Sequence, residues 1–384
     1  MKRRLVVLGS AASEPYAGMA WMHMQFVEGF RRLGHDVYYF ETNSSWPYDP
    51  ERGSYVADSD YALPYLHRLL ESFGLSGAWA YRRSYSDKQW FGMSQAAAVE
   101  LLASADAVFN ISGSTLTAEE DLRVGRLVYV GTDPVGHEAR YVAGEPRVHA
   151  HLSQHSDFVT YGENLGTPAS PLPALPGLCA RMRQPVLLDL WESGAPCRQE
   201  FTTVCNWQQD GEIEFEGEKY FWSKHLEFLK FIDLPTRSGE RIELAASRVG
   251  EDDRRLLESN GWLLTDPQPL TIDPWPYRDY IRASRGEFTV AKDQNVRLRS
   301  GWFSERSACY LAAGRPVVTQ DTGFGTVLPT GEGLFAFNSM DEILTAFEAI
   351  NSDYQKHSRA AREIAGQYFR AETVLGKLLE DLGL

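Results

Sequence analysis

The segment RGEFTVAKDQNVRLRSGWFSERSACYLAAGRPVVTQDTGFG, residues 285–325, holds the clearest structural signals in the chain. Its first apolar run, Glu287–Ala291, is predicted to be a buried strand because it is short and contains Phe and Val. The polar stretch Lys292–Gly301 is expected to be a loop. Ser304 has the residue type that caps a helix, and Pro316–Thr319 is predicted to be the next strand. The segment therefore predicts a strand–helix–strand unit.

The polar stretch of this unit carries three cations, Lys292, Arg297 and Arg299. A helix N-terminus offers free backbone N–H groups and a favourable dipole to an anion. The cations and the predicted helix N-terminus together indicate a phosphate site. The alternative interpretation is an ordinary strand–helix unit whose cations are solvated.

Length and composition restrict the class of protein. The chain has 384 residues, enough for two domains, and its formal net charge of −14 repels polyanions, so nucleic acid is not the expected partner. Its four cysteines show no C-x-x-C spacing, which fits a reducing cytoplasm and indicates neither disulfides nor zinc. No apolar run is long enough to span a bilayer, and Leu5–Leu8 is too short for a signal peptide. We therefore expect a cytoplasmic protein with no bound metal and no membrane association.

Strands and helices alternate over the first part of the chain. An amphipathic helix, Trp21–Leu33, follows the first strand, and Thr42–Ala57 is expected to be a long aromatic loop. A G-x-G-x-x-G dinucleotide fingerprint is absent. The alternation predicts a doubly wound, Rossmann-like domain at residues 1–166, whose strand ends line one crevice. The predicted strands are Leu5–Leu8, His35–Phe40, Ala107–Ile111, Leu127–Val130 and Phe158–Tyr161.

A proline-rich segment at residues 166–177 cannot form a helix or a central strand. Residues 167–200 are therefore expected to connect two domains. A second strand–helix series follows, which predicts a second Rossmann-like domain at residues 201–365. The last helix, residues 366–384, closes the chain, with a return to the N-terminal domain as one option. The strands predicted in the second series are Phe201–Cys205, Ile242–Ala246, Trp262–Leu264, Glu287–Val290 and Pro316–Thr319.

Three landmarks in this order resemble the GT-B glycosyltransferases, which bind a nucleotide sugar between two Rossmann-like domains. GFRRLGHDVYYFE, residues 29–41, is similar to the N-terminal helix–turn–strand of that fold. ACYLAAGRPVVTQDTG, residues 308–323, is similar to its donor-site unit, and FTTVCNW with Lys224 takes the place of its phosphate-binding lysine region. Within the fold, the chain resembles a bacterial group that carries SGWFSxRSACYLAxGRPVVxQDTG.

The resemblance implies a fold of two Rossmann-like domains that face each other, and a metal-independent glycosyltransferase. Its co-substrate is a nucleoside diphosphate sugar, with UDP or dTDP as the expected nucleotide, and it needs no other cofactor. Cations and a helix N-terminus then stabilise the leaving diphosphate. The residues expected to bind the donor are Gly18, Lys224, Lys292, Arg297, Arg299, Ser300, Gly301, Trp302, Phe303, Ser304, Arg306, Asp321, Thr322 and Gly323.

The chain departs from the family pattern at one point. Many retaining GT-B enzymes carry two glutamates eight positions apart around the donor helix. That register falls on Gly301 and Cys309 here, with Glu305 halfway between them. The sequence therefore leaves both retention and inversion of the sugar configuration open.

Asp133 and His137 are the expected catalytic pair, because both follow the predicted strand Leu127–Val130. A carboxylate and a histidine at a strand end can remove the proton of an acceptor hydroxyl. The alternative is that Asp133 only caps the following helix. Trp46 and Tyr48 in the aromatic loop suit a small planar or apolar acceptor, as in secondary metabolism. The other histidines considered, His23, His149, His151 and His155, are expected to have packing or surface roles.

Three further functions stay open on the sequence. A nucleotide-sugar 2-epimerase shares the fold but needs a deeply enclosed site without an acceptor channel. A DNA-base glucosyltransferase also shares it, although the acidic net charge opposes DNA binding. A non-catalytic nucleotide-sugar sensor is consistent with the missing glutamate pair. The oligomeric state is not indicated.

Overall fold

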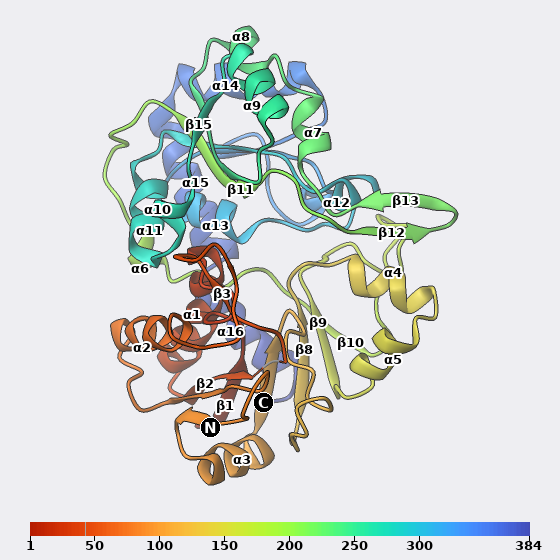
Figure 1. Cartoon of the computed structure of the whole chain (residues 1–384). Coiled ribbons are helices and arrows are strands. Elements are labelled where there is room, and N and C mark those ends of the chain that lie inside the picture. The colour runs from red at the N-terminus through yellow and green to blue at the C-terminus, as the bar shows by residue number, and fades with distance from the viewer. Residues whose placement is uncertain (43) are drawn as a thin grey trace.

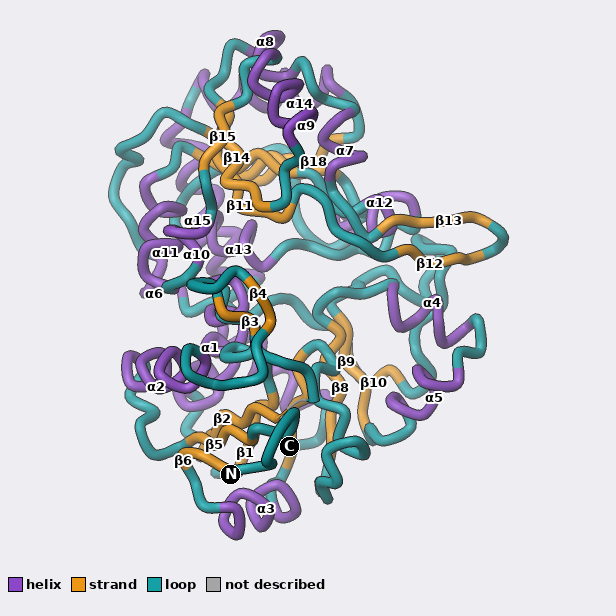
Figure 2. The backbone as a smooth tube through the Cα atoms, viewed as in Figure 1, coloured by secondary structure: helices purple, strands orange, loops and turns teal. Residues whose placement is uncertain are grey.

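The structure, a computed structural model, describes residues 1–42 and 44–384. It has two large sheets, one in each half of the molecule (Figures 1 and 2). The strands of the first sheet are β1 (Arg4–Leu8), β2 (Asp36–Thr42), β5 (Trp79–Arg82), β6 (Trp90–Gly92), β7 (Ala107–Ile111), β8 (Leu127–Gly131), β9 (Asp157–Thr160) and β10 (Leu178–Arg181). Their order is β10-β9-β8-β7-β1-β2-β5-β6, and all neighbours are parallel except β6 with β5.

Both faces of this sheet are covered by helices, as the continuous apolar run of β1 requires. Leu5 and Val7 face one core with Phe26 and Phe30 of the first helix, whereas Val6 and Leu8 face another. Successive strand residues point to opposite faces, so a four-residue apolar run is buried on both sides. The helices of this domain are α1 (Ala17–Arg32), α2 (Ala62–Ser72), α3 (Gln95–Ser104), α4 (Gly136–Val142) and α5 (Pro146–Leu152).

The second sheet is fully parallel, with the order β15-β14-β11-β16-β17-β18. Its strands are β11 (Phe201–Asn206), β14 (Ile242–Ser247), β15 (Leu263–Thr265), β16 (Gly286–Thr289), β17 (Val317–Gln320) and β18 (Leu334–Phe337). Its helices are α7 (His225–Leu229), α8 (Leu234–Ser238), α9 (Glu251–Ser259), α10 (Gln268–Thr271), α11 (Pro274–Ala283), α12 (Asp293–Arg297), α13 (Glu305–Ala312), α14 (Met340–Ser352) and α15 (Tyr354–Tyr368), with a 3₁₀ turn at Phe324–Thr326.

Several predicted boundaries differ from the structure. The expected connection at residues 167–200 contains β10, which pairs with β9 and extends the first sheet, and a short helix, α6 (Leu188–Trp191). The expected loop Lys292–Gly301 contains helix α12. The expected loop Thr42–Ala57 contains a small hairpin, β3 (Tyr48–Asp49) and β4 (Ser54–Tyr55), while Asn43 lies outside the described residues.

A second hairpin was not predicted from the sequence. It consists of β12 (Glu212–Phe215) and β13 (Glu218–Phe221), inserted between β11 and α7. In Figure 1 this hairpin projects from the C-terminal domain above α4 of the N-terminal domain. Its apolar residues Ile213 and Phe215 share one core with Val135 and Leu172 of the N-terminal domain. The hairpin thus joins the two domains.

The chain crosses between the domains twice, and the two crossings lie side by side. Val186 N–H donates to Phe369 O (2.7 Å), and Ala371 N–H donates to Val186 O (3.0 Å). After the second crossing, α16 (Ala371–Asp381) returns to the N-terminal domain, where its leucines pack in the core of α1. Both termini therefore lie in that domain (Figure 1).

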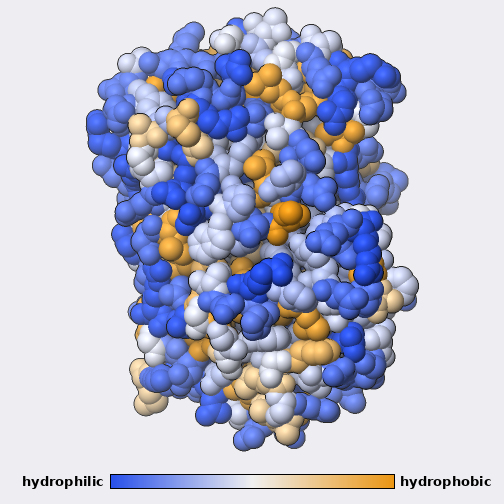
Figure 3. Space-filling model, turned by 60° about the vertical axis from the view of Figure 1, so that its left-hand side comes forward, coloured by the Kyte–Doolittle hydropathy of each residue, from blue (hydrophilic) through white to orange (hydrophobic). Residues whose placement is uncertain are grey.

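Figure 3 shows one face of the molecule, on which hydrophilic residues prevail and apolar areas are small and separate. No helix in the described part of the chain has both the length and the apolar composition needed to cross a bilayer.

Candidate functional site

The carboxyl ends of the two sheets meet at the boundary between the domains. Trp302 Nε1, from the segment after α12, donates to Thr132 O at the end of β8 (3.1 Å). Asn164, in the loop after β9, donates its backbone N–H to Ser300 O (3.0 Å). Open parallel sheets bind ligands at their carboxyl edges, where the strand order reverses. In the second sheet this reversal lies between β11 and β16.

Lys224 lies close to this reversal point, and its side chain is largely buried. Its side chain precedes α7, is 6% exposed, and forms no hydrogen bond or ion pair with any described residue. Burial, together with the neighbouring Arg306 guanidinium, lowers the pKa of Lys224 to about 7. A lysine in this state takes up a proton when an anion arrives beside it.

Lys292 connects the two domains. Its ammonium pairs with Asp133 Oδ2, from the loop after β8, and lies 3.9 Å from the ring centroid of Trp222. Trp222 Nε1 also donates to Asp133 Oδ2 (2.6 Å). The other oxygen, Oδ1, is buried and has no hydrogen-bond partner within residues 1–42 and 44–384. One carboxylate oxygen is therefore fixed by two donors and the other is unused by the protein.

Helix α13 points its N-terminus toward this region. Its first backbone hydrogen bond runs from Ala308 N–H to Ser304 O (3.0 Å), so the N–H groups of the first turn lack acceptors within the helix. Ser304 is the cap residue, as predicted, but its side chain makes no capping hydrogen bond in the part of the chain that the structure describes. The free N–H groups and the helix dipole favour an anion here.

The three predicted phosphate-binding arginines are already paired within the protein. Arg306 pairs with Glu287 and donates to Val204 O (2.7 Å). Arg297 pairs with Glu218 of the hairpin β12–β13. Arg299 approaches Asp321 at 3.4 Å and is the most exposed of the three. Their pairing identifies structural roles, and their contact with phosphate stays a prediction.

The other predicted donor residues form two loops beside α13. Ser300 donates its hydroxyl to Asn295 Oδ1 (2.7 Å), and Phe303 packs against Phe324. Thr322 donates its hydroxyl to Trp302 O. Gly323 N–H donates to Asp321 Oδ1 (2.7 Å), so Asp321 forms the Asx-turn that was its alternative interpretation.

Gly18 occupies the first turn of α1 and has open space beside it. A Cβ added there would meet no described atom within 4 Å. The loop before it is held by Glu41 at the end of β2, which accepts the backbone N–H groups of Ala12 (2.8 Å) and Ser13 (2.6 Å). His23 accepts from Ser10 N–H and contacts Met19 O (2.7 Å), so it is a satisfied core histidine.

The two predicted catalytic residues, Asp133 and His137, have separate hydrogen-bond partners. His137 Nδ1 contacts Tyr129 OH, and no hydrogen bond joins Asp133 to His137 in the described chain. Burial lowers the pKa of His137 to about 4, so it is neutral at physiological pH. The cap of α4 is Val135, so Asp133 does not cap that helix either. The catalytic roles of both residues stay predictions.

Trp222, Asn164 and Glu305 were not among the predicted site residues. Glu305 at the first position of α13 accepts from Gln25 Nε2 of α1 (2.7 Å), across the domain boundary. In the sequence, Glu305 is marked by its position halfway between Gly301 and Cys309, where the family pattern has its two glutamates. Asn164 follows a predicted strand end, which is also where polar ligand-facing residues occur. Trp222 carried no signal, because its partner Asp133 lies 89 positions away.

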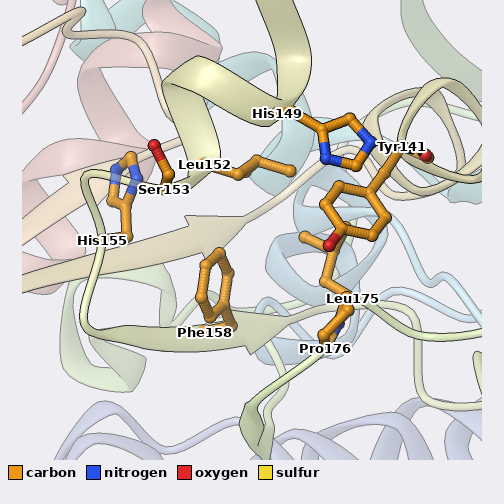
Figure 4. Close-up of a pocket in the computed structure, with 8 residues that line it drawn as sticks. All are labelled: Tyr141, His149, Leu152, Ser153, His155, Phe158, Leu175 and Pro176. Atoms are coloured by element: carbon orange, nitrogen blue, oxygen red, sulfur yellow. Dashed lines mark hydrogen bonds between the residues drawn. The ribbon is translucent and has the colours of Figure 1, made fainter. Parts of the chain in front are cut away.

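A separate pocket of about 240 Å³ lies at the opposite end of the first sheet, beside the start of β9 and β10 (Figure 4). The rings of Tyr141 and His149 stack there with centroids 4.0 Å apart. Its position at the amino ends of the strands separates it from the site above. Nowhere in residues 1–42 and 44–384 do three His, Cys, Asp or Glu side chains form a group that could hold a metal ion.

No protein-family model matches the sequence, and a comparison with curated proteins finds no match. Among solved structures, the chain is similar to an alpha-glucosyltransferase in complex with UDP and DNA that contains an HMU base. That likeness has a TM-score of 0.59 and 9% identity over 100% of both chains. The chain has the GT-B fold.

Two further GT-B structures support this conclusion. One is Alr3699/HepE of Anabaena in complex with UDP and glucose, with a TM-score of 0.55 and 12% identity over 99% of both chains. The other is AviGT4, a glycosyltransferase involved in avilamycin A biosynthesis. It has a TM-score of 0.52 and 11% identity over 98% of this chain and 96% of that chain. The expected pair of facing Rossmann-like domains is thereby confirmed.

Proposed function

We propose that the protein is a glycosyltransferase that moves a sugar from a nucleoside diphosphate sugar to an acceptor hydroxyl. The observation that carries the proposal is Lys224, a largely buried lysine whose ammonium has no hydrogen bond or ion pair within the described chain. An unpaired buried cation is costly, and an anionic ligand removes the cost. Lys224 lies at the carboxyl edge of a GT-B donor domain, so a diphosphate is the ligand that fits.

The leaving diphosphate is stabilised by three groups in this proposal. Lys224 becomes protonated as the donor binds, Lys292 contributes a second charge, and the first-turn N–H groups of α13 donate hydrogen bonds. These groups act where negative charge develops in the transition state. They take the place of a metal ion. The UDP bound to similar structures supports UDP as the nucleotide, with dTDP as the other expected nucleotide.

A thermal-shift series with UDP, dTDP, GDP and CDP tests the donor class. Binding to the native state raises the melting temperature, by about 2.7 kcal/mol of stability at a hundredfold excess over Kd. We expect a shift of several degrees with UDP or dTDP, unchanged by magnesium or EDTA. A series with no shift at millimolar nucleotide contradicts the donor assignment. A shift that needs magnesium contradicts metal independence alone.

Asp133 is the proposed base for an inverting transfer. Trp222 and Lys292 hold Oδ2, so Oδ1 is the oxygen that can accept the proton of an acceptor hydroxyl. Asp133→Asn is expected to lower kcat by about 10²–10⁴-fold, the usual contribution of a general base. UDP binding should be no weaker, because Lys292 loses the carboxylate that competes with phosphate.

The matched control for this variant is Asp157→Asn. Asp157 also pairs with a cation, Arg126 (2.7 Å), but at the far end of the first sheet. It should leave kcat unchanged. A kcat of Asp133→Asn equal to that of the wild type shows that the base assignment is wrong, and a retaining mechanism then becomes the better account.

A small planar acceptor is the proposed partner. Tyr16 and Tyr48 stack at 5.5 Å, Tyr48 meets Tyr55 edge-on at 5.4 Å, and both Tyr55 and Trp46 are more than half exposed. Exposed aromatic faces suit a flat acceptor. DNA is the second candidate, since several similar structures contain it, while the net charge of −14 opposes it. Transfer from labelled UDP-glucose to phenolic compounds or to duplex DNA separates the two.

A further inference from the structure

Asn164 lies where the N-terminal domain touches the two loops beside α13. These loops, here called the sugar loops, are residues 299–301 and 321–323. Their predicted role is to face the sugar of the donor. Asn164 belongs to the other domain, in the loop after β9, and only 3% of its surface is exposed. Any order that it imposes on the sugar loops therefore acts across the domain boundary.

The side-chain amide of Asn164 forms hydrogen bonds with both sugar loops. Nδ2 donates to Arg299 O (3.1 Å) in the first loop and to Gly323 O (3.0 Å) in the second. Oδ1 accepts from Thr326 Oγ1 (2.8 Å). An amide nitrogen has two hydrogens, and both are used here. No other amide orientation satisfies these three partners, since a reversed amide would place its oxygen against two carbonyl oxygens.

Two glycines make room for Asn164. Gly301 has φ +76° and Gly323 has φ +88°, a region that favours glycine. A Cβ on Gly301 would lie 2.8 Å from Asn164 N, and a Cβ on Gly323 would lie 2.5 Å from Asn164 Nδ2. The contact thus accounts for the glycine at position 301, where many retaining GT-B enzymes carry a glutamate. The N-terminal domain occupies the space that a side chain would need.

We infer that Asn164 is a positioning residue, which fixes both sugar loops so that they hold the sugar of the donor. This inference rests on the proposed function. The groups assigned to the diphosphate, Lys224 and Lys292, form no hydrogen bond with Asn164 in the described chain. Loss of Asn164 should therefore lower kcat/KM for the sugar donor and leave the affinity for the nucleotide nearly unchanged.

Asn164→Asp tests this with UDP and UDP-glucose as the two probes. The aspartate has the same shape but no N–H groups, so it repels the carbonyls that Asn164 binds. We expect the Kd of UDP to change by less than about twofold. We expect kcat/KM for UDP-glucose to fall by about 100-fold, the loss typical of a misplaced reacting group. Thr326→Val removes one of the three bonds, together with the contact of the same hydroxyl to Gly323 O (3.0 Å), and should cause a smaller fall of the same kind.

Asn110→Asp is the matched control. Asn110 is fully buried in the N-terminal domain and makes a similar pair of bonds, with Thr115 O (2.9 Å) and Thr115 N (3.0 Å). Asn110→Asp should lower the melting temperature, but it should leave the ratio of the Kd of UDP to kcat/KM for UDP-glucose as in the wild type. Hydrogen exchange without ligand gives a second readout: the amides of Gly301 and Gly323 should exchange faster in Asn164→Asp and in Thr326→Val, but not in Asn110→Asp.

The failures of the inference and of the proposed function look different. If the wild type binds neither probe, the proposed function fails and the inference fails with it. If the wild type binds both, an equal loss for UDP and UDP-glucose in Asn164→Asp overturns the inference alone. So does an unchanged kcat/KM in both Asn164→Asp and Thr326→Val. If Asn164→Asp does not fold, Thr326→Val decides by the same criteria.

Discussion

Replacing Lys224 with methionine is expected to stabilise the ligand-free protein and to weaken nucleotide binding strongly. The side chain is 6% exposed, its ammonium has no partner in the described chain, and burial lowers its pKa from the usual 10.5 to about 7. Between these values the unfolded state binds a proton that the native state lacks, so the lysine costs stability at neutral pH. At 1.36 kcal/mol per pKa unit, the gain for methionine at pH 7 is about 2–4 kcal/mol. Methionine is of similar length and apolar, so it fills the same space.

The pH dependence of this gain has a definite sign. Stability of the wild type rises from pH 7 toward pH 10.5, because the unfolded lysine loses its proton over that range. The difference in melting temperature between Lys224→Met and the wild type should therefore be largest near pH 7 and shrink toward pH 10. Thermal unfolding at pH 7 and pH 9.5 measures it. Lys219→Met, at a hairpin lysine that is 60% exposed, is the control and should change neither stability nor binding.

Nucleotide binding supplies the second half of the prediction. A diphosphate next to Lys224 raises the pKa of the ammonium, so binding near pH 8 should take up protons. Calorimetry of UDP binding in two buffers of different ionisation enthalpy measures that uptake, which should vanish in Lys224→Met. The affinity for UDP should fall by at least about 100-fold, as for the loss of a charged hydrogen bond of about 3 kcal/mol. A variant that still binds UDP normally, or one that is destabilised at pH 7, contradicts the assignment.

The sequence predicts most of the sheet strands, because a strand that is buried on both faces is a continuous run of apolar residues. The strand at 107–111 and the helix that begins after Ser304 were located within a residue or two. The hairpin β12–β13 was missed although its signal was present: Ile213 and Phe215 alternate with glutamates before a turn at Gly217. β10 was missed because it is a short edge strand next to a proline-rich segment, where propensity favours a loop.

The site was less predictable because pairing depends on residues that the fold brings together. Lys224 could be singled out, since a lysine at a helix start opposes the dipole. The sequence around Arg306 and Lys224 does not indicate that Arg306 pairs with Glu287 while Lys224 has no partner. Which cation is paired depends on the groups that the fold places beside it, and not on its position in the chain. The side-chain hydrogen-bond partners of Asn164 lie 135 to 162 positions away in the sequence, too far for a local sequence pattern to predict them.

Glu305→Gln is expected to stabilise the protein above neutral pH. Burial raises the pKa of Glu305 to about 8. The hydrogen bond from Gln25 favours the charged form, but its effect on the pKa is smaller than that of burial. In the unfolded chain the carboxyl loses its proton near pH 4.5, so the native state becomes less stable as the pH rises from 4.5 to 8. A glutamine keeps the acceptor for Gln25 and does not ionise. The gain should be about 2–4 kcal/mol above pH 8 and close to zero at pH 4.5.

Thermal unfolding of wild type and Glu305→Gln at pH 4.5 and pH 8.5 measures this gain. Glu348→Gln, at an exposed position of α14, should show no such change. A melting temperature of Glu305→Gln below that of the wild type at pH 8.5 contradicts the prediction, since it means that the charged carboxylate is stabilised in the native state.

The protonated state of Glu305 also matters for the donor. The residue lies in the first turn of α13, whose N-terminus is the proposed diphosphate site. A carboxylate there would compete with phosphate for the helix dipole and repel it, whereas a neutral carboxyl does neither. Ionisation of Glu305 near pH 8 should therefore weaken donor binding, and Glu305→Gln should extend kcat/KM for the donor to higher pH. If the alkaline limb of the pH profile is the same in both proteins, another group controls it, and the role of Glu305 is confined to the contact between α13 and α1.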